Sequence, residues 1–341
     1  MDRIYRLLHL NFANQDDRNI WYLILEIFWS SMLASAASFN AAYVVHLGAS
    51  NTVIGWFNSI PALLAVIISL PAGRFLQRRT QRKPWILWAL TIYRLSYLMM
   101  ALIPLIQLLH IPQGSLAVLW LISWTAPATF FNVGWTPMLA DVIPVEKRAA
   151  TFTARNVVVG ATMSVFTFLF GQWLYRVAFP LNYQLMYCFG VITSMMSIYF
   201  LLRIKVPDSV VSPPVAIKTR LNLRQQVLTV KKSIADYPGF FQIVLNTTFY
   251  GIGLWLVQPL YIIYYVRTLH ANDAWIGLQG TVGSLATIFG YTLWRWIMTR
   301  WGEHNTLKRT IITQGLFPVL VALSPSLTII LIAVALNGLV A

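Results

Sequence analysis

Long apolar stretches alternate with short polar segments along nearly the whole chain. A helix that crosses a bilayer needs about 20 mostly apolar residues, and stretches of that length recur here with Pro or Gly near their ends. The pattern therefore predicts an all-α integral membrane protein with nine or ten transmembrane helices present. The predicted spans are 22–44, 53–76, 85–109, 114–140, 151–176, 181–203, 239–266, 274–298 and 307–324, with a tenth that begins near Leu327 and is cut off at Ala341.

Composition supports the same fold class. The chain of 341 residues is 58% hydrophobic and only 10% charged, whereas soluble domains carry about 25% charged residues. This excludes a soluble enzyme and a disordered tail. Cys188 is the one cysteine and forms no internal disulfide. The first apolar run is too long for the core of a cleavable signal peptide, so we expect it to stay as a membrane anchor.

The basic residues are distributed unequally between the two sides of the predicted membrane. Of the 25 Lys and Arg residues, all but Arg94, Arg176 and Arg267 fall in segments on the same side as the N-terminus. Cytoplasmic loops carry such an excess, so we expect a cytoplasmic N-terminus and a multi-pass protein of the cell membrane. The net charge of +15 then needs no nucleic-acid partner.

Two segments of the chain resemble each other at a constant offset. Residues 43–55 are similar to residues 264–277, and aligning Gly55 with Gly277 gives an offset of 222 that also places Arg78 on Arg300. Such matches in equivalent topological positions indicate two parallel six-helix halves. On this basis the intact protein would extend to roughly residue 425.

The repeat divides the chain into four parts. They are a cytoplasmic N-terminal segment (1–21), an N-terminal six-helix bundle (22–205), a basic cytoplasmic linker (206–237) and an incomplete C-terminal bundle (238–341). The linker contains an amphipathic pattern with basic residues off its apolar face, which suits either a helix on an anionic leaflet or a solvated linker.

Two junctions carry motifs of a known family. The first reads Gly73-Arg-Phe-Leu-Gln77-Arg78-Arg79-Thr80-Gln81-Arg82-Lys83 and the second reads Asp141-Val-Ile-Pro144-Val-Glu-Lys-Arg148. The first resembles the major facilitator superfamily (MFS) signature Gly-x-x-x-Asp-Arg-x-Gly-Arg-(Arg/Lys). Gly73, Arg78 and the basic end match, whereas Gln77 replaces the acid. The second also resembles a common pattern of the family.

The resemblance implies a secondary transporter in which two bundles rock about a site near the midplane. In that family the basic loop helps to close the cytoplasmic side through ion pairs, and here Asp141 could pair with Arg78. The alternative is that these arginines only set topology and contact lipid phosphate. The candidate cytoplasmic gate residues are Gly73, Gln77, Arg78, Arg82, Asp141, Arg148 and Arg300.

Polar residues follow single faces of three predicted helices. Such stripes either line a cavity or pack helices together through hydrogen bonds worth about 0.6 kcal/mol each. The stripes lie on the first, fourth and seventh helices. By resemblance, these are the helices that line the cavity in the major facilitator superfamily. The candidate cavity residues are Glu26, Asn40, Arg94, Asn132, Asn246, Tyr250, Trp255 and Gln258.

Glu26 and Arg94 are charged and lie at similar depths within predicted spans. A charge at the bilayer centre costs about 2.5–3.5 kcal/mol on insertion scales, so each needs a reason to be there. Arg94 could anchor an anionic substrate and Glu26 could be a protonatable coupling site. The two could also form a buried structural pair.

No pattern of catalytic or metal-binding residues is present. The five His lie outside the spans or at their ends, and no nucleotide-binding glycine motif occurs. We therefore expect neither an enzyme nor a cofactor. The family resemblance implies secondary active or facilitated transport of a small solute by alternating access. The alternative is a transporter-like membrane scaffold or assembly factor. The expected partners are a small-molecule substrate, protons if Glu26 couples transport, and membrane lipids, with the protein acting as a monomer.

Overall fold

The computed structural model describes residues 11–106, 112–206 and 238–340, and within these ranges it contains helices and no β-strand. The helices are α2 (Gln15–Ala37), α3 (Asn40–His46), α4 (Asn51–Gln77), α5 (Lys83–Leu102), the 3₁₀ helix η1 (Ile103–Leu105), α6 (Gln113–Ser123), α7 (Thr125–Val142), α8 (Val145–Arg176), α9 (Leu181–Arg203), α11 (Pro238–Ile263), the π-helix η2 (Tyr264–Thr268), α12 (Asp273–Trp301), α13 (Glu303–Leu323) and α14 (Leu327–Val340).

The predicted spans coincide with these helices. The first span is formed by α2 and α3, which are separated by a break at Ser38 and Phe39, and the fourth is formed by α6 and α7, which meet at Trp124. In the described part of the chain, seven segments are long and apolar enough to cross a membrane, and α13 and α14 contain shorter apolar stretches. The fold class expected from the sequence is confirmed.

The starts of α4 and α12 have the same local structure. The side chain of Ser50 accepts a hydrogen bond from the backbone N–H of Val53 (3.3 Å), and that of Asn272 accepts one from Trp275 (2.9 Å). A side-chain acceptor at this position stabilises a helix start. Ser50 and Asn272 are 222 residues apart, and so are Val53 and Trp275. This is the offset that relates the two halves of the sequence.

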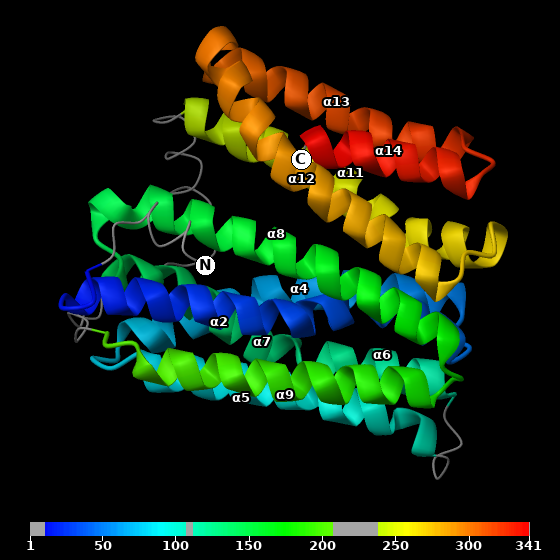
Figure 1. Ribbon diagram of the computed structural model, residues 1–341, viewed down its shortest axis with the longest axis horizontal. Coiled ribbons are helices and arrows are strands. Elements are labelled where there is room, and N and C mark those ends of the chain that lie inside the picture. Colours follow the sequence, from blue (N-terminus) through cyan, green and yellow to red (C-terminus); the bar gives the residue numbers. More distant parts are fainter. Residues whose placement is uncertain (1–10, 107–111, 207–237, 341) are drawn as a thin grey trace, which may run out of the picture.

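The helices form two groups that lie side by side (Figure 1). We call α2–α9 the N-terminal half and α11–α14 the C-terminal half. At the boundary between the halves, the long helix α8 of the N-terminal half packs along α12 of the C-terminal half. A Cβ atom on Gly171 would lie 2.8 Å from the Cα atom of Gly277, and one on Gly160 would lie 2.8 Å from Ile288. Small residues therefore allow the two halves to approach closely, as expected for packing in a membrane.

The outer surface is apolar. On α4, for example, Val66 is 74% exposed and Leu63 is 61% exposed. Many polar residues lie inside instead, among them Ser35, Ser194 and Thr193. A soluble monomer rarely exposes such large apolar areas, so this surface suits contact with lipid chains.

Two helices begin at least six residues before their predicted spans. The helix α2 begins at Gln15 rather than at residue 22, and α8 begins at Val145 rather than at residue 151. As a result, Arg155 lies about three turns inside α8, although the sequence analysis grouped it with the cytoplasmic charges. Apart from Val206, the predicted linker 206–237 lies outside the described residues.

Candidate functional site

The helix bundle has two ends that differ in their contacts. We call the end where α3 stops and α4, α9 and α12 start the His46 end. The opposite end, where α4 and α12 stop and α11 starts, is called the Arg78 end. Because every predicted span crosses from one end to the other, these two ends correspond to the two sides of the membrane.

A cavity of about 450 Å³ lies between the two halves. Helices α2, α3 and α4 contribute to it from the N-terminal half, and all four helices of the C-terminal half line the other side. Two predicted cavity residues, Asn40 and Gln258, are part of its wall. The side-chain oxygen of Asn40 accepts a hydrogen bond from the hydroxyl of Tyr187 (2.9 Å), and its amide nitrogen donates one to the hydroxyl of Tyr97 (3.3 Å).

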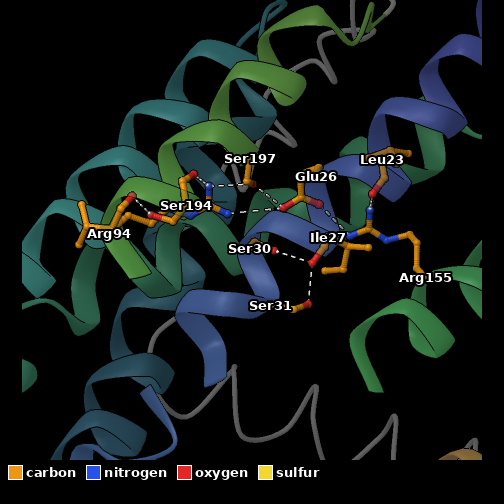
Figure 2. A network of polar contacts seen from close by, with 10 residues as sticks. Leu23, Glu26, Ile27, Ser30, Ser31, Arg94, Arg155, Ser194 and Ser197 are labelled. Carbon is orange, nitrogen blue, oxygen red and sulfur yellow. Dashed lines mark hydrogen bonds and ion pairs between the residues drawn. The ribbon is translucent and has the colours of Figure 1, made fainter. Parts of the chain in front are cut away.

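The predicted pair of Glu26 and Arg94 forms, and Arg155 completes it. Figure 2 shows Glu26 between the two guanidinium groups, with Arg94 on one side and Arg155 on the other. One carboxylate oxygen of Glu26 lies 3.5 Å from Nη2 of Arg94, and the other lies 3.1 Å from Nη2 of Arg155. All three residues are at most 5% exposed. Ser197 donates a hydrogen bond to Glu26 (3.0 Å) and accepts one from Arg94 (2.8 Å).

Backbone carbonyl groups complete these contacts. Arg94 donates to the carbonyl oxygen of Ser194 (2.7 Å), and Arg155 donates to that of Leu23. We call Glu26, Arg94, Arg155, Ser194 and Ser197 the Glu26 cluster, and it joins α2, α5, α8 and α9. None of its members lines the cavity between the halves. This arrangement favours the interpretation of Glu26 and Arg94 as a structural pair.

At the His46 end, a buried carboxylate links the two halves. One carboxylate oxygen of Asp273, in the first turn of α12, accepts a hydrogen bond from the hydroxyl of Tyr183 (2.8 Å) and lies 3.3 Å from Nε2 of His46. Asp273 is 7% exposed. We call these three residues the Asp273 cluster. Beside it, Arg267 of the C-terminal half donates hydrogen bonds to the side chain of Asn51 and the backbone of Ala49 in the N-terminal half.

At the Arg78 end, three cations bind the last carbonyl groups of helices. Arg82 donates to Leu76 (3.1 Å) at the end of α4. Arg148 donates to Ala140 (2.6 Å) in the last turn of α7. Lys83 donates to the carbonyl oxygens of Leu202 (2.7 Å) and Ile204 (2.6 Å), which end α9. A positive charge at a helix C-terminus is stabilising because carbonyl groups there lack partners within the helix.

The other predicted gate residues have different surroundings. Gly73 packs α4 against α7, since a Cβ atom there would lie 3.7 Å from Val133. Gln77, Arg78 and Asp141 are exposed, and among the described residues no ion pair joins Asp141 to Arg78. The suggested pair is therefore not formed in this conformation. Arg300 is in the last turn of α12, at the end that the repeat predicts.

Three further predicted cavity residues, Asn132, Asn246 and Tyr250, do not line the cavity. Asn132 on α7 and Asn246 on α11 are exposed at other positions. The hydroxyl of Tyr250 donates a hydrogen bond to Gln314 and so links α11 to α13. The side chain of Trp255 lies outside the described residues.

Several residues that the structure brings into the site were not among the predicted ones. Arg155 looked like a cytoplasmic charge, although its position inside the predicted span 151–176 could have marked it as buried. His46 and Asp273 are 227 positions apart, so no local pattern connects them. Asn58, Gln279 and Asn337 line the cavity but belong to none of the polar stripes.

Comparison with known proteins identifies the family. The family model for the Major Facilitator Superfamily matches residues 23–341. No curated protein matches the chain. Solved structures with the same fold include that of the nucleoside transporter NupG, with a TM-score of 0.58, 12% sequence identity and coverage of 94% of this chain and 79% of that one.

Two further solved structures are similar to the same extent. For a D-xylose–proton symporter the TM-score is 0.58 at 16% identity, with 95% of this chain and 78% of that chain covered. For a bacterial homologue of the human lysosomal transporter Spinster, in an inward-facing and unoccupied conformation, the TM-score is 0.55 at 14% identity, with 96% and 74% covered. The chain belongs to the Major Facilitator Superfamily, and it is a transporter that moves a small solute across a membrane by alternating access.

Proposed function

We propose that this carrier is in an inward-open conformation, with the Arg78 end in the cytoplasm and the Asp273 cluster closing the outer side. The observation that carries the proposal is the uneven distribution of polar contacts between the halves. Among the described residues, the hydrogen bonds and ion pairs that join the halves lie at the His46 end, except for one from Thr281 to Ser164 along α8 and α12.

The exposure of α11 supports the same conformation. Residues 241–249, in the part of α11 nearest the Arg78 end, are exposed, whereas Tyr265 in η2 near the His46 end is 5% exposed. The halves therefore make closer contact at the His46 end. In an alternating-access cycle the contacts at the closed end must break before that end can open.

The distribution of charge supports the orientation. Arg78, Arg79 and Arg82 lie at the Arg78 end, and Arg203 and Lys205 lie where α9 ends on the same side. Such an excess of Lys and Arg marks the cytoplasmic side of a bilayer. We accordingly assign the protein to the cell membrane with its N-terminus inside.

Cysteine labelling tests orientation and conformation together. In a Cys188→Ser background, single cysteines are placed at Thr52 (His46 end), Thr80 (Arg78 end) and Ala41 (in the cavity wall). A membrane-impermeant maleimide is then applied to either side of oriented membrane vesicles. We expect Thr52→Cys to react from outside and Thr80→Cys from inside. Ala41→Cys should react faster from inside.

Each outcome has a clear meaning. Reaction of Thr80→Cys from the extracellular side would overturn the orientation. Faster reaction of Ala41→Cys from the side that labels Thr52→Cys would overturn the inward-open conformation. An equal rate from both sides would contradict the proposal that the inward-open conformation is the favoured one.

The contacts of Glu26 favour a structural role over proton coupling. Both of its carboxylate oxygens contact arginines of the same half, and Glu26 is absent from the cavity wall. A coupling site must communicate with the change between the two open states. We therefore propose that the Glu26 cluster holds the N-terminal half together as one rigid unit during that change.

A further inference from the structure

The wall of the cavity contains carboxamide side chains from both halves. Asn58 lies on α4, Gln258 on α11, Gln279 on α12 and Asn337 on α14. Within the described part of the chain, none of these four side chains has a hydrogen-bond partner. They differ in this from Asn40, which two tyrosines hold in place.

Among the described residues, the wall of the cavity contains no charged side chain. A charged solute would lose its water shell there without gaining a counter-ion, which costs several kcal/mol. A carboxamide offers both donors and an acceptor, so it can bind hydroxyl groups, which also donate and accept. The aromatic residues Phe57, Tyr261 and Phe317 add flat apolar surfaces to the wall.

We infer that the cavity binds an uncharged solute with several hydroxyl groups, and that Asn58, Gln258, Gln279 and Asn337 donate and accept the hydrogen bonds that select it. The inference rests on the proposed function because it takes this cavity as the transport site. The cavity volume of about 450 Å³ falls in the range of about 300–1,000 Å³ typical of small-molecule sites. A sugar and a nucleoside share the required chemistry.

Charged substrates fit the structure less well. Arg94, which the sequence suggested as an anchor for an anion, donates its hydrogen bonds to Ser194, Ser197 and Glu26 outside the cavity wall. A cationic solute would need a carboxylate, and Asp273 and Glu26 are absent from the wall as well. The carboxamides are therefore the groups that can determine specificity.

A panel of matched solutes tests this inference on the purified full-length protein. Glucose, glucuronate and glucosamine have the same ring but differ in charge, and uridine and uridine 5′-monophosphate extend the comparison to nucleosides. Binding is measured by isothermal titration calorimetry. We expect an uncharged member to bind about tenfold or more tightly than its charged counterparts, because of the cost of an unpaired buried charge. Tighter binding of glucose than of uridine would indicate a sugar as the substrate, and the reverse would indicate a nucleoside.

Substitutions of similar size test the role of the carboxamides. Gln258→Met, Gln279→Met and Asn337→Leu each remove hydrogen-bonding groups while keeping most of the volume. Each should raise the Kd of the preferred solute by about 2- to 12-fold, the range expected for one hydrogen bond. The control is Gln184→Met, which removes a half-buried carboxamide of α9 outside the cavity wall. Unchanged thermal unfolding of each variant shows that it is folded.

Two results would overturn the inference. One is tighter binding of a charged member than of its neutral counterpart, or no binding of either neutral solute. The other is an unchanged Kd in all three folded variants. Both leave the proposed conformation and orientation intact, because the labelling of Thr52→Cys, Thr80→Cys and Ala41→Cys needs no substrate. A transporter-like scaffold would bind none of these solutes. Its cysteine labelling at Thr52, Thr80 and Ala41 would also stay the same when Gln258 is replaced.

Discussion

Replacement of Asp273 by alanine is expected to open the His46 end of the protein and to slow transport. The carboxylate of Asp273 accepts the hydrogen bond from Tyr183 and contacts His46 across the boundary between the halves. A hydrogen bond to a charged group contributes about 1.5–3 kcal/mol. The contact with His46 adds less, since the side chain of His46 is 40% exposed.

The lost contacts stabilise the inward-open state, so their removal shifts the equilibrium toward the outward-open state. A change of about 1.5–3 kcal/mol corresponds to a shift of roughly 10- to 150-fold in the equilibrium. The rate at which Ala41→Cys reacts from the extracellular side should therefore rise by at least about tenfold. Solute flux should fall because the return to the inward-open state becomes unfavourable.

Two further variants separate the effect of the Asp273 cluster from general damage to the fold. Asp273→Asn keeps a carbonyl acceptor for Tyr183 and should have a smaller effect than Asp273→Ala. Glu146→Gln neutralises an exposed carboxylate in the first turn of α8, at the other end of the bundle, and should leave the labelling unchanged. If Ala41→Cys reacts at the same rate in Asp273→Ala as in the parent protein, the Asp273 cluster does not hold this end closed.

Replacement of Glu26 by glutamine should strongly destabilise the N-terminal half. The substitution leaves Arg94 and Arg155, both at most 5% exposed, without their shared counter-ion. Removing one partner of a buried ion pair typically costs about 3–5 kcal/mol. Thermal unfolding of the protein in detergent, followed by tryptophan fluorescence, should show a clear loss of stability. Glu146→Gln should unfold like the parent protein.

Removing all three charges should reverse much of this loss. The triple variant Glu26→Gln, Arg94→Gln, Arg155→Gln leaves no uncompensated charge, and neutral replacement of buried ion pairs is often tolerated. We expect its stability to lie above that of Glu26→Gln alone. A triple variant less stable than the single variant would show that the contacts of the arginines with Ser194, Ser197 and Leu23 matter more than the charge balance.

Flux measurements distinguish this structural role from proton coupling. In proteoliposomes, Glu26→Gln should reduce downhill flux and pH-driven accumulation in proportion, because the variant lowers the amount of folded carrier. A coupling site would behave differently. It would lose accumulation under a pH gradient while keeping downhill flux per folded molecule, and that result would restore Glu26 as the site of proton coupling.

The helices could be predicted from the sequence because a bilayer restricts the possible structures. Backbone groups in lipid must be satisfied within helices, so apolar runs of sufficient length mark them directly. The pairing of Glu26 with Arg94 was also accessible, since a buried charge needs a partner and their depths agree. Arg155 was missed because an arginine near the end of a span resembles those that only set orientation.

The cavity was harder to predict than the helices. Periodicity shows which residues share a face of a helix, but the packing of other helices decides what that face contacts. Gln258 faces the cavity, whereas Asn132, in an equally regular stripe, does not line it. The contact between His46 and Asp273 depends on how the two halves meet, which no local pattern encodes.

In this mechanism the halves must separate at the His46 end during each transport cycle. The most direct test joins Thr52 of α4 to Thr268 of η2, next to the contact between Asn51 and Arg267. Both are replaced by cysteine in the Cys188→Ser background and linked with a flexible, cleavable bifunctional reagent. The matched control links Thr52 to Gln113, which belongs to the same half.

We predict that solute flux into proteoliposomes falls to background when Thr52→Cys and Thr268→Cys are linked, and that it returns when the linker is cleaved. The control link and a monofunctional reagent should leave most of the flux. Continued flux through protein whose halves are covalently joined at this end would contradict the account.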